Sequence, residues 1–176
     1  TANFRAQKGH PVLIEAFATV AQRMPEARLV LLGDGPELPA ARRLVGELGL
    51  AGRVELPGPQ ADVWPWLATA HVFALASHYE PLGIAVLEAM GAGLPVVATG
   101  VDGIRELVWP GVTGELVPPG DPAAMAQALI AILEDPGAAT QMGTAGRAAA
   151  AENRMELCVE RYFDLYERLL GERGAG

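Results

Sequence analysis

The chain has 176 residues, of which 51% are hydrophobic and 19% charged, so it can bury a sizeable core and is not intrinsically disordered. Thirteen Lys and Arg residues against twenty-one Asp and Glu residues give a net charge of −8, which excludes a nucleic-acid binder with a broad basic surface. An anionic small molecule remains an acceptable ligand, because a pocket needs only a local positive potential.

Two rare residue types are informative. Twelve of the basic residues are arginine and one is lysine, Lys8. The one cysteine, Cys158, allows no intramolecular disulfide and no Cys-rich metal site, which suits the cytoplasm. No apolar run reaches the roughly 18–20 residues that span a bilayer, and no signal peptide pattern opens the chain. We therefore expect a soluble, cytoplasmic protein.

Helical and strand patterns alternate along the chain. Apolar spacing predicts an amphipathic helix over 10–24, and the apolar run 27–32 before Gly33-Asp34-Gly35-Pro36 predicts a buried strand and a turn. Further strands are predicted at 53–56, 71–76, 95–99 and 114–117, and further helices at 38–48, 61–68, 83–92, 104–108, 123–133 and 137–151. This order predicts an α/β fold over residues 1–154: a Rossmann-like, doubly wound parallel sheet with helices on both faces.

The C-terminal residues 155–176 have a different pattern. Apolar residues three and four positions apart from Met155 to Leu169 predict an amphipathic helix that needs a surface to lie on. The final five residues are predicted to fray.

Ligands of doubly wound sheets bind at the carboxyl ends of the strands, where residues 77–90 contain two carboxylates. Glu80 lies at a strand exit, and Glu88 lies inside the helix that follows Pro81-Leu82-Gly83. The start of that helix is an anion site, and Gly83 is expected to let a phosphate approach closely. Carboxylates on both sides of an anion site suit a nucleotide sugar, which has ribose, diphosphate and hexose in line.

The segment Glu80 to Glu88 resembles the Glu-x7-Glu motif of retaining GT-B glycosyltransferases, family 4, also called glycosyl transferases group 1. Other segments match that family in order: Lys8-Gly9, 33–36, 54–58, 91–98, 103–106 and 111–121. The resemblance covers nearly the whole chain but only the C-terminal, donor-binding half of such an enzyme.

The resemblance implies a role for each matching residue. Lys8 would contact the donor diphosphate, Glu80 the transferred sugar and Glu88 the ribose hydroxyls. The remaining contacts would come from backbone groups of Leu82, Gly83 and Ile84, at the sugar and phosphates, and from the Gly33 and Pro57-Gly58 loops, at the base. One departure is Asn3, which stands where these enzymes often have an arginine; Arg5 substitutes only if the chain places it suitably.

The resemblance also implies the reaction. A sugar would pass from a UDP-, GDP- or ADP-sugar to the hydroxyl of a saccharide or lipid-linked acceptor, with retention of configuration and without a metal or obligatory cofactor. The acceptor site lies in the N-terminal domain that this chain lacks, so we expect the fragment alone to be inactive. That domain would also supply any peripheral contact with a membrane, and residues 155–176 would pack on it.

Other interpretations stay open at this stage. The chain could be a nucleotide-sugar binding module without transfer activity, or a sugar-nucleotide epimerase, although no additional acid/base residues are evident. Lys8 and the two glutamates could be ordinary surface charges. A dinucleotide fingerprint is incomplete, because Leu38 stands at its third glycine position. The three histidines are too scattered to predict a metal site.

Overall fold

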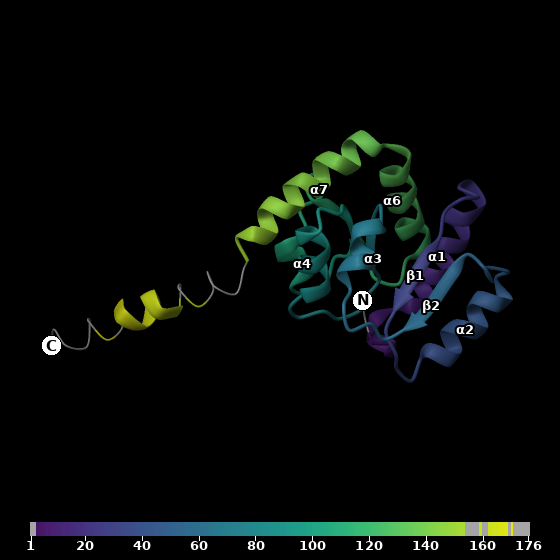
Figure 1. Cartoon of the computed structure of the whole chain (residues 1–176), viewed down its shortest axis with the longest axis horizontal. Helices are drawn as coiled ribbons and strands as arrows, with labels where there is room; N and C mark the ends of the chain where they lie inside the picture. The colour runs from purple at the N-terminus through teal and green to yellow at the C-terminus, as the bar shows by residue number, and fades with distance from the viewer. Residues whose placement is uncertain (1–2, 154–158, 160–161, 169, 171–176) are drawn as a thin grey trace.

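The computed structural model describes residues 3–153, 159, 162–168 and 170 (Figure 1). In chain order its elements are η1 (Ala6–Lys8, a 3-10 helix), α1 (His10–Arg23), β1 (Leu29–Leu32), α2 (Leu38–Glu47), β2 (Val54–Gly58), α3 (Trp64–Thr69), β3 (Phe73–Leu75), α4 (Ile84–Gly91), β4 (Val96–Thr99), α5 (Ile104–Leu107), β5 (Gly114–Val117), α6 (Pro122–Glu134) and α7 (Pro136–Ala151). Each helix and strand predicted up to residue 151 is present, and its ends differ from the prediction by at most three residues.

The helix predicted over 155–170 lies mostly outside the described residues. Within it, residues 162–168 are helical. Among the described residues, no helix combines the length and apolarity needed to cross a membrane.

All strand ladders are parallel, but they form two groups. β1 pairs with β2, and β4 lies between β3 and β5. Within the described part of the chain no ladder joins β1 to β3. The predicted Rossmann-like architecture of parallel strands between helices is therefore confirmed, and in the part of the chain that the structure describes its strands form two groups.

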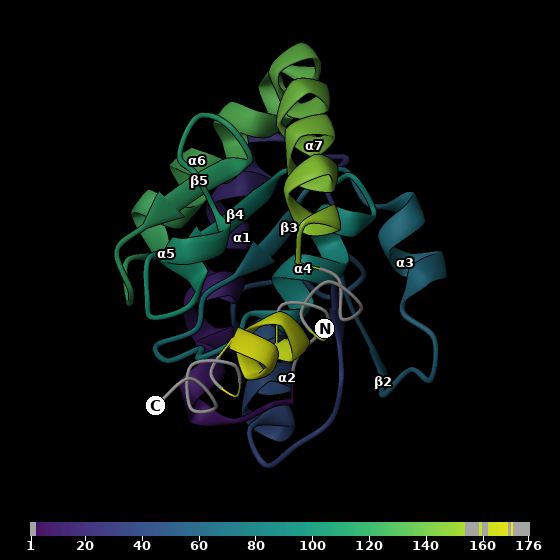
Figure 2. The same cartoon turned by 90° about the vertical axis from the view of Figure 1, so that its left-hand side faces the viewer.

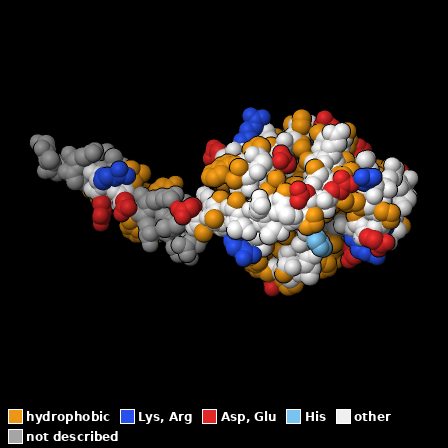
Figure 3. All heavy atoms as spheres, turned by 90° about the horizontal axis from the view of Figure 1, so that it is seen from above, with side chains coloured by type: hydrophobic (Ala, Val, Ile, Leu, Met, Phe, Trp, Pro, Cys, Tyr) orange, Lys and Arg blue, Asp and Glu red, His pale blue; other side chains and the backbone are white. Residues whose placement is uncertain are grey.

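Helices cover both faces of the strands (Figure 2). One apolar cluster joins α1, α2 and α6 to β1 and the inner strands, and a second joins α3, α4 and α5 to β3 and β4. All four residues of β4 are buried, as expected for a parallel strand with helices on both sides. On the face shown in Figure 3, basic side chains lie singly among acidic ones, as the net charge suggests.

The N-terminal segment ties the carboxyl ends of β1 and β3 together. The backbone N–H of Phe4 donates to Asp34 O at 2.9 Å, just beyond β1. The N–H of His78, just beyond β3, donates to Gln7 O at 2.7 Å. The Phe4 ring is fully buried and stacks on His10, with ring centroids 4.0 Å apart. These contacts therefore fix the position and direction of η1 and of the start of α1.

Gly9 connects η1 to α1 and has no room for a side chain. Its φ of 62° lies in the left-handed region. A Cβ at this position would overlap the backbone oxygen of Ala76. The close approach of Gly9 to the end of β3 is what holds Lys8 beside the loop that follows that strand.

We expect Gly9→Ala to lower the free energy of unfolding by about 2–4 kcal/mol, from left-handed strain and the overlap together. Gly49→Ala is a matched control, because Gly49 has a φ of 67° and open space around its added Cβ. The control should cost about 1 kcal/mol. Urea unfolding of both variants measures the difference, and equal losses would show that the Ala76 contact imposes no constraint.

His10 gives stability a pH dependence. Burial, followed by nearby positive charges that include Lys8, lowers the pKa of His10 from 6.5 to about 4. The unfolded chain thus binds a proton below pH 6.5 that the folded chain refuses until about pH 4. Stability that is fully present above pH 6.5 is therefore lost as the pH falls toward 4.

Between pH 7 and pH 5 this single group should remove about 2 kcal/mol of stability. His10→Phe keeps an aromatic ring on Phe4 and removes the titration. Urea unfolding at both pH values should show a smaller pH effect in the variant than in the unmodified chain. An unchanged pH effect would assign the dependence to other groups.

Candidate functional site

A cavity of about 460 Å³ opens where β1, β2 and β3 end and α4 begins. This volume is within the range of small-molecule sites. Its walls are formed by Asn3, Lys8, Leu32, Gly33, Pro59, Gln60, Val63, Glu80, Pro81, Leu82, Ile84, Ala85 and Glu88. Residues far apart in the sequence thus meet at the edge where the fold predicts a ligand.

Lys8 and Glu80 form an ion pair in the wall of this cavity. The ammonium of Lys8 donates to Oε2 of Glu80, and the two side chains are 19% and 12% exposed. Because an ammonium has three N–H donors, Lys8 can keep this bond and donate to a ligand oxygen as well. The pair holds a cation ready at one side of the cavity.

Glu80 is positioned by the loop after β4. Its backbone N–H donates to Oδ2 of Asp102 at 3.3 Å. Asp102 has a φ of 35°, and the next residue, Gly103, packs without a side chain against the backbone oxygen of Pro81. Asp102 follows the strand predicted over 95–99, but no pattern in the sequence singled out its carboxylate.

The start of α4 lies at the cavity, and the first backbone N–H groups of a helix have no partner within the helix. The first hydrogen bonds within the helix run from Val86 and Leu87 N–H to Gly83 O, at 2.9 and 3.0 Å. The N–H groups of Ile84 and Ala85 precede them, and both residues line the cavity. This is the arrangement that favours an anion at a helix start.

Gly83 packs against α5 at the start of α4. Its φ of 64° is the left-handed start of α4, and a Cβ there would lie 2.8 Å from Leu107 Cδ1. The missing side chain therefore makes room for α5. Gly83 is not among the cavity-lining residues, whereas its neighbours Leu82 and Ile84 are.

Glu88 lies further along α4 and lines the same cavity. It stands four residues after Ile84, so the two share a helix face, separated by a rise of about 6 Å. Glu80, the start of α4 and Glu88 thus border one cavity, with the helix start between the carboxylates in the chain.

The Gly33 loop lines the cavity, whereas Pro57 and Gly58 do not. The strand predicted to end at residue 56 continues to Gly58, because Pro57 is tolerated on β2, an edge strand. The loop that reaches the cavity therefore starts two residues later, with Pro59 and Gln60.

The family resemblance drew attention to Asn3, which stands where an arginine is common, and to Arg5 as its possible substitute. Asn3 lines the cavity, whereas the exposed Arg5 does not. Within the described ranges, no cluster of three His, Cys, Asp or Glu side chains is placed to hold a metal ion.

Comparison with known proteins agrees with this architecture. The family model described as "Glycosyl transferases group 1" matches residues 1–135. N-acetyl-alpha-D-glucosaminyl L-malate synthase of Bacillus anthracis is 36% identical over 169 residues, which are 96% of this chain and 44% of that protein. The GDP-mannose-dependent alpha-(1-6)-phosphatidylinositol monomannoside mannosyltransferase of Mycolicibacterium smegmatis is 36% identical over 84% of this chain and 41% of its own length.

Among solved structures, HepE of Anabaena in complex with UDP superposes with a TM-score of 0.85 at 30% identity. The match covers 97% of this chain and 47% of HepE, and HepE in complex with UDP-glucose gives the same figures. The chain thus spans less than half the length of these relatives, and its fold corresponds to one half of a GT-B glycosyltransferase. Since the family model matches most of its residues, the chain belongs to the glycosyl transferases of group 1.

Proposed function

We propose that this chain is the donor-binding half of a glycosyltransferase that moves a sugar from a nucleoside-diphosphate sugar to an acceptor hydroxyl. One observation carries the proposal. A single cavity joins the lone lysine, two glutamates and the start of α4. Membership of the family supports the same activity.

The donor fits the cavity in one direction. Its diphosphate lies at the N–H groups of Ile84 and Ala85, within reach of the Lys8 ammonium. Its ribose hydroxyls donate to Glu88, and its sugar lies beside Glu80. Gly33, Pro59 and Gln60 border the base. In this proposal Pro59 and Gln60 thus take the place that the family resemblance implied for Pro57 and Gly58.

The chemistry follows from where charge develops. When the bond between the anomeric carbon and the diphosphate breaks, negative charge grows on the departing oxygen. Lys8 and the helix start stabilise that charge more in the transition state than in the ground state. In this proposal Lys8 and the helix start take the role that a metal ion would have. The acceptor hydroxyl attacks the anomeric carbon from the face that the diphosphate leaves, so the configuration is retained. Glu80 orients the sugar and offsets positive charge on it.

The identity of the base is the least constrained part of the donor. HepE was solved with UDP and UDP-glucose, and the mannosyltransferase is named for GDP-mannose. Both support a nucleoside-diphosphate sugar without choosing between the bases. UDP is therefore the first ligand to test, followed by GDP and ADP.

The acceptor site belongs to the rest of the enzyme in this proposal. The chain covers 44% and 47% of two full-length relatives, which leaves more than half of each outside it. Leu82 and Ile84 at the cavity are 68% and 60% exposed, so an apolar rim faces outward. This chain should therefore bind the donor and transfer nothing, and transfer by the 176 residues alone would contradict the assignment.

Lys8→Ala should weaken UDP binding by about 10–100-fold, the usual loss for a charge-assisted hydrogen bond to phosphate. Glu80→Gln should leave UDP binding intact or tighten it a few-fold, because Lys8 loses its neutralising partner. Titration calorimetry with the unmodified chain and both variants measures these changes. Arg5→Ala is the control for a lost cation, since Arg5 does not line the cavity and should bind UDP normally.

In a full-length enzyme that contains this domain, Glu80→Gln should reduce turnover by about 100-fold or more while UDP affinity holds. Equal losses of turnover and UDP affinity would remove the role assigned to Glu80. Failure of the unmodified chain to bind UDP, GDP or ADP at millimolar concentration would remove the proposed site.

Glu88→Ala should weaken UDP binding by about 10-fold or more but leave binding of 2′,3′-dideoxy-UDP unchanged, since only UDP offers hydroxyl donors to the carboxylate. Glu47→Ala, on the exposed face of α2, is the matched control. The same loss for both nucleotides would mean that Glu88 acts on the charge of the diphosphate and not on the ribose.

A further inference from the structure

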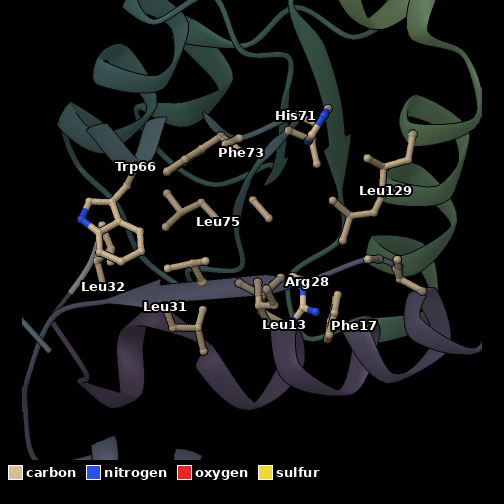
Figure 4. Close-up of a pocket in the computed structure, with 18 of the residues that line it drawn as sticks. Leu13, Phe17, Arg28, Leu31, Leu32, Trp66, His71, Phe73, Leu75 and Leu129 are labelled. Carbon is tan, nitrogen blue, oxygen red and sulfur yellow. The ribbon is translucent and has the colours of Figure 1, made fainter. Parts of the chain in front are cut away.

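Glu80 lies on the loop that follows β3, and this loop runs beside the loop that follows β4. β3 pairs with β4 through a parallel ladder. On the other side of β3 lies a second cavity, of about 430 Å³, where Phe73 and Leu75 face Leu31 of β1 (Figure 4). Among the described residues, the ladder partner that directs the end of β3 is therefore β4.

The loops after these two strands are joined by side chains. The backbone ladder reaches Leu75 at the end of β3. Beyond it, the hydroxyl of Thr99 donates to Ser77 O at 2.5 Å. The N–H of Glu80 donates to Oδ2 of Asp102 at 3.3 Å, and the residues of both pairs are 22 positions apart. Side chains of the second loop thus continue the alignment of the strands as far as Glu80.

A backbone contact fixes the spacing of the two loops next to this bond. A Cβ at Gly103 would lie 2.3 Å from Pro81 O, so no side chain separates the two backbones there. The carboxylate of Asp102, one residue earlier, reaches the N–H of Glu80 across the same short spacing.

Asp102 has a backbone conformation that a glycine would adopt at lower cost. Its φ is 35°, and the other positive φ values among the described residues all belong to glycines. Aspartate tolerates the left-handed region better than most residues, but a glycine carries no Cβ penalty there. Backbone outliers of this kind are found where the surrounding structure requires them, often at functional sites. Here a glycine would lose the carboxylate that bonds to the Glu80 loop.

We propose that Asp102 is a positioning residue for Glu80. Its carboxylate holds the Glu80 backbone so that the Glu80 side chain meets Lys8 and, in the donor complex, the sugar. Asp102 does not line the donor cavity, so it acts through Glu80. The role toward the sugar rests on the proposed function, whereas the role in the ion pair does not.

The first test uses the one lysine of the sequence as a reporter. Acetic anhydride must reach the Lys8 nitrogen, which the ion pair with Glu80 restrains and shields. The acetylation rate of Lys8 is measured by mass spectrometry of its peptide in the unmodified chain, Asp102→Gly, Asp102→Asn, Glu80→Gln and the double variant Asp102→Gly/Glu80→Gln. Glu106→Gln, on the exposed side of the neighbouring α5, is the control for a lost negative charge. Urea unfolding is recorded for every variant.

Asp102→Gly should raise the acetylation rate by about 3-fold or more, the usual effect of one lost hydrogen bond. Asp102→Asn should restore most of the slow rate, because its amide oxygen also accepts the Glu80 N–H. The double variant should react no faster than Glu80→Gln. The urea midpoint of Asp102→Gly should stay within about 0.5 M of the unmodified value, since relieved backbone strain offsets the lost bond.

The positioning role is overturned if Asp102→Gly leaves the Lys8 rate unchanged, or if its effect adds to that of Glu80→Gln. It is also overturned if Glu106→Gln raises the rate equally, because the charge and not the bond then matters. A large fall in the urea midpoint that Asp102→Asn shares would assign Asp102 to general stability instead.

The second test measures turnover in a full-length enzyme that contains this domain. Asp102→Gly should lower kcat by about 10-fold while the inhibition constant of UDP stays within about twofold, and Asp102→Asn should recover most of the loss. Unchanged kcat in Asp102→Gly beside a lowered kcat in Glu80→Gln overturns the role toward the sugar. Unchanged kcat in both variants removes the proposed function of Glu80 instead, and the acetylation rates still decide whether Asp102 positions it.

Discussion

The site depends on a junction of backbone against backbone at the N-terminal segment. Phe4 bonds to the exit of β1, Gln7 bonds to the exit of β3, and Gly9 packs against Ala76 where only a glycine fits. These contacts fix the position and direction of η1. As a consequence, the ammonium of Lys8 lies beside the loop that carries Glu80 and pairs with that glutamate. The junction thus places Lys8 beside Glu80 at the carboxyl ends of the strands.

In the proposed function, that arrangement lets an acidic chain bind an anion. The chain has a net charge of −8, and Lys8 and the start of α4 meet at the cavity beside Glu80 and Glu88. Pairing Lys8 with Glu80 restrains the long side chain before a ligand arrives, so less conformational entropy remains to be lost on binding. It also keeps a shielded ammonium from being buried without a partner. A lysine suits this role better than an arginine, because a compact ammonium can serve two acceptors in different directions.

Much of the fold and part of the site could be predicted from the sequence. Helix and strand positions follow from apolar spacing. Glu80 and Glu88 stand out because the family motif coincides with a predicted strand exit and the helix after it. Lys8 stands out as the one lysine of the sequence and as a match to the family. Contacts between segments that are distant in the chain leave no local pattern in the sequence, so they could not be predicted from it. The strand predicted over 53–56 continues through Pro57 to Gly58, because β2 is an edge strand among the described residues and tolerates a proline there.

Other tertiary contacts could not be predicted from the sequence either. The space that Gly83 leaves for Leu107 of α5 is one of them. Asp102 supports Glu80 from twenty-two positions away, a relation that no periodicity contains. The separation of the strands into two groups could not be predicted either, since each strand pattern is intact and, within the part of the chain that the structure describes, only the pairing between β1 and β3 is missing.

The separation of the strands into two groups bears on the cavity at the strand ends. Gly33 and Gln60 come from the β1–β2 group, whereas Glu80 and the start of α4 come from the β3–β4–β5 group. Within the described residues the two groups meet through helix packing and the N-terminal segment, not through a ladder. A ligand that touches both groups favours the relative placement in which both walls are correctly spaced. By linkage, any contact that stabilises this placement also strengthens the binding of such a ligand.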